Sequence, residues 1–215
     1  PVSIIFIRAI KLVAPSNFSD LWRDAFMSDT IETWRKDHAN FAQLLKLLEA
    51  QVEFFLEDQK PNYGLMLDIL YYMTHYPDVF HHPKEDLVSA RIRKLDAGAG
   101  VLVEDLMQQH VVLRESGAKM LELLQGITDG VMLKRESVEE PARIYIAYFR
   151  SHMKKEETEI FPLAQTLLSE VDWADIETAA PFKADPLFGD GSLESRYAVL
   201  HQQIVVEAGR ARGSK

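Results

Sequence analysis

The chain has 215 residues, 47% of them apolar, which fits one large domain or two small ones with a core that needs no disulfides. Its 24 basic and 33 acidic residues give a net charge of −9, which argues against nucleic acid and anionic membranes as main partners. The absence of cysteine excludes disulfides, thiolate zinc sites, iron–sulfur clusters and thiol nucleophiles. No uncharged apolar run approaches the length of a membrane span, so we expect a cytoplasmic protein.

The first predicted element is an amphipathic helix over residues 30–57, preceded by an N-terminal arm over residues 1–29. Its apolar residues recur at steps of three and four, with Glu, Lys and Gln on the opposite face. The step from Trp34 to Phe41 passes through His38, so this histidine is predicted to point into the core.

The second predicted helix runs from about residue 63 to residue 92, with a kink where prolines occur at 77 and 83. Its later apolar stripe contains His81 and Glu85. The glycines at 98 and 100 end this region, and a third helix over residues 101–127 carries His110 in its apolar stripe.

The fourth predicted helix covers residues 138–168, bent near Pro162, and carries His152 and Glu156 on one apolar face. A short helix at 171–178, a connector and a final helix over 192–208 with Ser192 as N-cap follow. The predicted fold class is therefore all-α, an up-down four-helix bundle over residues 30–170. Residues 171–215 are expected to form a C-terminal connector and an additional helix packed on the bundle.

A repeated spacing is the most informative feature of the sequence. His38 and His81 are 43 residues apart, His110 and His152 are 42 apart, and a glutamate follows each second histidine by four residues. Residues four apart share one face of a helix, so each such pair directs two donors toward one point. Packing two such hairpins as a bundle brings six side chains to one central layer: His38, His81, Glu85, His110, His152 and Glu156.

This layer points to a metal site rather than to an ordinary core. A lone histidine in an apolar stripe is usually a structural core residue. Four stripes that carry histidine or glutamate at matched spacing are far less probable as independent core substitutions. Burying this many ionisable groups costs several kcal/mol each unless something pairs them. Imidazole and carboxylate without thiolate suit iron, manganese or zinc, and two carboxylates among several imidazoles can bridge two ions.

Two other metal sites are excluded by spacing. Ferritin-like di-iron bundles use Glu-x-x-His, and no histidine here has a glutamate three residues before it; Asp78 before His81 comes nearest. The sequence also lacks His-Glu-x-x-His, which excludes a zincin protease.

Four segments resemble the hemerythrin-like, or HHE cation-binding, domain over about residues 30–170. They are Asp37-His38, the run Tyr76-Pro-Asp-Val-Phe-His-His-Pro-Lys-Glu85, His110 preceded by Gln108-Gln109, and the run from His152-Met-Lys-Lys-Glu-Glu to Phe161-Pro162. The resemblance implies a bundle holding two non-haem iron ions bridged by oxo or hydroxo groups and carboxylates, with zinc or manganese as possible substitutes.

The resemblance also implies roles for individual residues. His38, His81 and Glu85 would serve one iron, His110 and His152 the other, and Glu85 and Glu156 would bridge. Oxygen-carrying members place two histidines one turn apart on the third helix, whereas this chain has Leu106 one turn before His110. His82 either replaces that missing ligand or, because a regular helix turns it about 100° from His81, only supports the site from its flank.

The leading hypothesis is a di-iron protein that binds or senses O2, NO or peroxide, since fewer imidazoles leave more open coordination positions than an oxygen carrier has. The alternatives are a di-iron oxidoreductase or peroxidase, and a structural bundle with a single adventitious metal. The sequence favours a metal- and oxygen-binding protein over a dedicated enzyme. It gives no oligomeric state.

Overall fold

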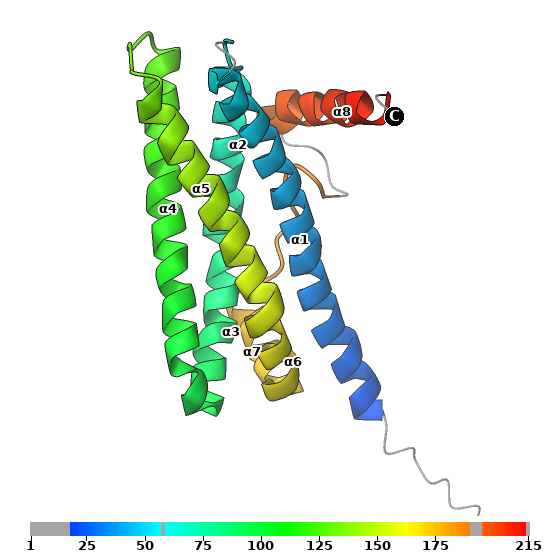
Figure 1. The fold of residues 1–215 in the computed structure, drawn as a ribbon. Helices are drawn as coiled ribbons and strands as arrows, with labels where there is room; N and C mark the ends of the chain where they lie inside the picture. Colours follow the sequence, from blue (N-terminus) through cyan, green and yellow to red (C-terminus); the bar gives the residue numbers. More distant parts are fainter. Residues whose placement is uncertain (1–17, 57–58, 190–194, 214–215) are drawn as a thin grey trace, which may run out of the picture.

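The computed structural model describes the backbone of residues 18–56, 59–189 and 195–213, which is helical over most of its length (Figure 1). The α-helices are α1 (Phe18–Leu56), α2 (Tyr63–Tyr76), α3 (His82–Leu95), α4 (Gly100–Thr128), α5 (Glu136–Lys155), α6 (Phe161–Leu167), α7 (Glu170–Ala179) and α8 (Ala198–Gly213). The shorter segments are π-helical η1 (Pro77–His81) and η3 (Glu156–Ile160), and 3₁₀-helical η2 (Ala97–Ala99) and η4 (Ser195–Tyr197).

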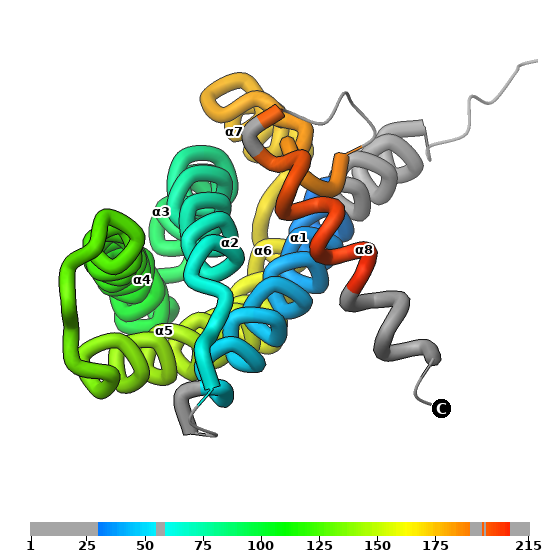
Figure 2. Tube along the Cα trace, turned by 90° about the horizontal axis from the view of Figure 1, so that it is seen from above, coloured from blue at the N-terminus to red at the C-terminus, as the bar shows by residue number. Residues whose placement is uncertain are grey.

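The long helices form an up-down bundle, so the predicted fold class is confirmed. α1 rises, α2 and α3 descend as one rod, α4 rises, and α5 and α6 descend (Figure 1). α1 contacts α2 and α5, and α4 contacts the same two helices on the opposite side, which closes the four rods into a ring (Figure 2). None of the helices in the described ranges combines the length and the apolar character that a bilayer span requires.

The predicted kinks at the prolines are π-helical turns. In η1 the N–H of His82 donates to the carbonyl of Pro77, five residues back, and in η3 the N–H of Phe161 donates to the carbonyl of Glu156. A proline, Pro83 or Pro162, follows directly in each case. Because proline has no N–H and its ring clashes with the carbonyl four residues back, the widened turn accommodates it inside an otherwise continuous rod.

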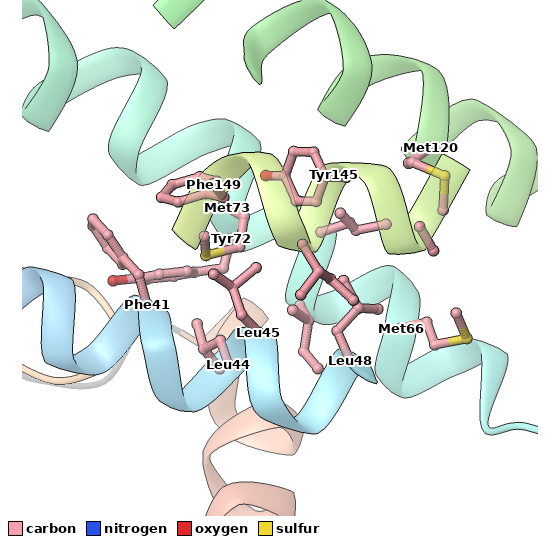
Figure 3. Packing of buried hydrophobic residues seen from close by; sticks show 14 of the residues in the cluster. Phe41, Leu44, Leu45, Leu48, Met66, Tyr72, Met73, Met120, Tyr145 and Phe149 are labelled. Carbon is pink, nitrogen blue, oxygen red and sulfur yellow. The ribbon is translucent and has the colours of Figure 1, made fainter. Parts of the chain in front are cut away.

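Two apolar clusters fill the bundle, one on each side of the histidine layer. The first cluster lies in the half where α1 ends and α2 begins (Figure 3), and its labelled members are Phe41, Leu44, Leu45, Leu48, Met66, Tyr72, Met73, Met120, Tyr145 and Phe149. The second cluster contains Ile31, Trp34, Val88, Ile92, Val103, Leu106, Ile160, Phe161 and Trp173. The polar layer is therefore sealed above and below by packed side chains.

The chain beyond the bundle returns along it before crossing its end. α7 begins with a capping box, in which Ser169 and Asp172 each bond the other's backbone N–H. It packs against α1 and α3, and the following segment leads up to α8, which lies across the end of the bundle (Figures 1 and 2). Leu200 and Ile204 of α8 are buried in the first apolar cluster. The terminal helix is thus packed on the bundle.

Two predicted boundaries differ from the structure. α1 begins at Phe18 rather than near residue 30, because residues 18–29 contain no proline or glycine to stop a helix. The final helix covers Ala198–Gly213 rather than residues 192–208. The predicted cap Ser192 and residues 1–17 of the predicted arm lie outside the described residues.

Candidate metal centre

The structure brings together all seven residues that the sequence singles out. They come from all four rods of the bundle and meet in the layer between the two apolar clusters. Each is at most 4% exposed: Glu156 (0%), Glu85 (1%), His152 (1%), His110 (2%), His38 (3%), His81 (3%) and His82 (4%).

These side chains form two groups that share one carboxylate. In the first group, potential ligand atoms of His38, His81 and Glu85 lie within 4.8 Å of one another. The second group joins the same Glu85 to three imidazoles at the same spacing, those of His82, His110 and His152. One group therefore offers two imidazoles and the other offers three.

Both glutamates span the two groups. Glu85 places Oε1 3.1 Å from Nε2 of His81 and Oε2 3.7 Å from Nε2 of His110. Glu156 places Oε2 3.3 Å from Nε2 of His38, while its Oε1 lies 3.2 Å from Nε2 of His152. Each carboxylate thus directs one oxygen toward each group.

The π-helical turns direct adjacent residues into the same layer. In a regular α-helix neighbouring side chains point about 100° apart, yet His81, the last residue of η1, and His82, the first residue of α3, are both buried. The ring of His82 stacks on that of His110, with centroids 4.4 Å apart and planes 15° apart. At the start of η3, Glu156 enters the layer and Glu157 hydrogen-bonds His38. His82 therefore lies inside the cluster and not on its flank.

Each of the five imidazoles has a polar partner at its outer nitrogen. Around the bundle, a helix supplies the partner for a histidine on its neighbour, except at His82, whose partner Asp78 lies one turn before it. The Nδ1 contacts are His38 to Glu157 (2.9 Å), His81 to Asp37 (3.0 Å), His82 to Asp78 (3.1 Å), His110 to Asp86 (2.8 Å) and His152 to Gln109 (3.2 Å).

These contacts define which nitrogen faces inward. When Nδ1–H donates to an oxygen outside the layer, Nε2 is left with its lone pair for a ligand inside it. In addition, both oxygens of Glu85, Oε2 of Glu156 and Nε2 of His152 are buried without a hydrogen bond of acceptable geometry. Buried polar atoms without partners are costly, and a cation between them would satisfy all of them. The donor set therefore fits a pair of bound metal cations.

Nearby carboxylates raise the pKa of two imidazoles. Burial by itself lowers the pKa of His81, but the charge of Glu85 and the hydrogen bond to Asp37 outweigh it and raise this pKa to about 10. Burial also opposes protonation of His110, and hydrogen bonds to Asp86 and to a site glutamate raise its pKa to about 9. Without metal, the surrounding carboxylates therefore favour the cationic form of both imidazoles.

The pKa values of the other groups respond mainly to burial and to the charges of their neighbours in the layer. Burial, together with the charge of His110, lowers the pKa of His152 to about 4. The same causes place the pKa of His82 well below its usual range. Burial and the charge of Glu156 raise the pKa of Glu85 to about 6. In the metal-free layer, protons therefore occupy some of the groups that would otherwise bind a cation.

The five outer partners were not predicted as a set. A sequence signal exists for four of them, because each is adjacent to a site residue: Asp37, Asp86, Gln109 and Glu157. A side chain next to an inward-facing one points to the flank, where the neighbouring helix lies. The two remaining histidines lie elsewhere: His75 bonds the carbonyl of Tyr71 through Nδ1 (2.7 Å), and His201 is exposed on α8.

Comparison with known families agrees with this arrangement. Residues 29–164, more than half of the chain, match the family model of the Hemerythrin HHE cation binding domain. The match includes all seven residues of the buried layer and their outer partners. A comparison with curated proteins gives no significant match.

Proposed function

Because the chain belongs to the hemerythrin HHE cation-binding family, we propose that its bundle holds two iron ions and that the protein binds or senses O2, NO or peroxide there. One observation carries the proposal. Glu85 and Glu156 each direct one oxygen to the first group and one to the second. A single ion needs no such pair of shared carboxylates, whereas two neighbouring ions do.

The donor types support iron. Five imidazoles and two carboxylates, with no thiolate in the chain, form the nitrogen and oxygen ligand set that suits iron, and zinc or manganese would be substitutes. His38 and His81 would hold one ion and His82, His110 and His152 the other. Two irons bound there would provide redox-active centres with open coordination positions for a small ligand.

The unequal groups indicate where such a ligand would bind. The first group has one imidazole fewer, so a cation held by His38 and His81 would keep more coordination positions open. Aromatic rings surround these two imidazoles: Phe161 stacks on His38 at 5.4 Å, and Phe41 contacts His81 edge-on at 5.2 Å. Apolar surroundings of this kind favour a small uncharged ligand over a charged one.

The test is anaerobic reconstitution with ferrous iron, followed by addition of O2, NO or peroxide in separate experiments. We expect a change in the visible spectrum with each reagent that binds, at an amount of reagent comparable to the amount of protein. Rapid repeated consumption of peroxide with a reductant would instead favour the oxidoreductase alternative. A colourless protein with one metal ion and no response would contradict the proposal and favour a structural bundle.

A further inference from the structure

A pocket of about 300 Å³ lies on the outer side of the first histidine group. Asp37 and His81, which bond each other, form part of its wall. α1 and the rod of α2, η1 and α3 form two sides, and the last turn of α7 together with the segment after it forms the third. That third side comes from residues 177–183, which follow the end of the family match at residue 164. One side of the pocket is therefore formed by residues that lie outside the family match.

The added wall is held in place by specific contacts. Glu177 pairs with Lys84 of α3 through one carboxylate oxygen, and its other oxygen accepts the N–H of Phe182 at 2.8 Å. The hydroxyl of Tyr76 donates to the carbonyl of Lys183 at 3.4 Å. The wall is thus bonded to the bundle at Glu177 and at Lys183, and Phe182 is bonded to Glu177.

The lining combines aromatic rings with the ammonium group of a lysine, Lys183. Phe80 and Phe182 line the pocket although they are 42% and 63% exposed, so two rings present uncovered area there. Asp37 pairs with His81, and Glu177 with Lys84. Lys183 has no carboxylate partner among the described residues, and its Nζ lies 5.9 Å from the ring centroid of Phe80. Two aromatic rings and the ammonium group of Lys183 therefore line the same pocket.

We propose that this pocket binds an aromatic carboxylate of one or two rings. The rings would cover Phe80 and Phe182, and the carboxylate would pair with the ammonium group of Lys183. A volume of about 300 Å³ lies at the small end of ligand pockets, which fits a ligand of this size and not a nucleotide. The ligand would contact the Asp37–His81 pair without coordinating metal.

The experiment is calorimetric titration of the full metal-free chain with 2-naphthoate and with its neutral analogue 2-naphthamide. We expect one naphthoate per chain and binding of the amide at least about tenfold weaker, a difference of about 1.4 kcal/mol. Lys183→Met should weaken naphthoate by a similar factor and leave the amide unchanged. The matched control is Lys119→Met, a change of an exposed lysine on α4, which should alter neither titration.

Several results would overturn this proposal. Equal affinity for acid and amide, or no effect of Lys183→Met, would show that the pocket does not select a ligand for its carboxylate. Absence of saturable binding at millimolar naphthoate would show that the pocket does not bind aromatic carboxylates. Binding only to the metal-loaded chain would mean that the carboxylate coordinates the ion. Iron uptake is measured separately, so a pocket that binds nothing leaves the iron proposal standing, and the reverse also holds.

Discussion

The two histidine groups share their carboxylates but differ in composition and surroundings. The first has two imidazoles, outer partners Asp37 and Glu157, and a pocket of about 300 Å³ beside it. The second has three imidazoles, and beside it lies a hollow of only about 30 Å³, lined by Asp78, Asp86 and Arg114 among others. The group with three imidazoles thus lies beside a small hollow, and the group with two imidazoles lies beside a larger pocket.

A single residue creates most of this inequality. Without His82 each group would contain two imidazoles, and His82 enters the layer because η1 is a π-helical turn. A local change of helix geometry at a proline can therefore convert two equal sites into two unequal ones.

Removing the metal from both groups at once should have the largest effect on stability. The metal-loaded chain is expected to melt roughly 10 °C above the chelated chain, because a ligand at about a thousand times its Kd stabilises by about 4 kcal/mol. Thermal unfolding with and without a chelator measures this difference. Identical melting curves would show that the buried layer does not depend on a cation.

Glu156→Ala should abolish binding in both groups, because this carboxylate contributes an oxygen to each. Metal analysis after ferrous reconstitution checks the loss. The matched control is Glu159→Ala, which removes an exposed carboxylate from the same π-helical turn and should leave the metal content unchanged. Retention of one ion at full occupancy in Glu156→Ala would show that this carboxylate serves one group only.

Changes at the outer partners should separate the two groups. Asp37→Asn weakens the acceptor for His81, and Asp86→Asn weakens the acceptor for His110. Each is expected to lower the affinity of its own group by about 10- to 100-fold and to spare the other. A stepwise ferrous titration resolves the two affinities. If both variants weaken the same binding step, the assignment of ligands to two groups is wrong.

The smallest effect concerns pH and the metal-free chain. The pKa values of His81 and His110 are about 10 and about 9 in the folded state, above the value of about 6.5 for an unfolded chain. Their contribution to stability is therefore complete below pH 6.5 and is lost as the pH rises through 9 and 10. Melting temperatures across this range should fall more steeply without metal, since a bound cation has already displaced both protons. Parallel curves would contradict these protonation states.

Much of the fold and of the site follows from local periodicity. The four rods, the inward position of His38 and the pairs four residues apart depend only on the helical repeat and are found as expected. The π-helical turns were not predicted, because the same prolines are compatible with a kink or a break. For that reason the sequence is compatible with both orientations of His82.

The surroundings of the site depend on contacts between distant parts of the chain. Asp37 and His81 are 44 residues apart, and Glu177 and Lys84 are 93 apart. Such pairs are set by how helices pack and not by the pattern within one helix. The outer partners and the pocket wall at residues 177–183 therefore emerged only from the structure.

The most direct test counts iron per chain after anaerobic ferrous reconstitution in three proteins: the unaltered chain, His82→Ala and His75→Ala. Two unequal groups predict about two irons in the unaltered chain, about one in His82→Ala, and two in His75→Ala, whose histidine lies outside the layer. Full occupancy in His82→Ala would contradict its role as a ligand, and one iron or none in the unaltered chain would contradict the two-ion site itself.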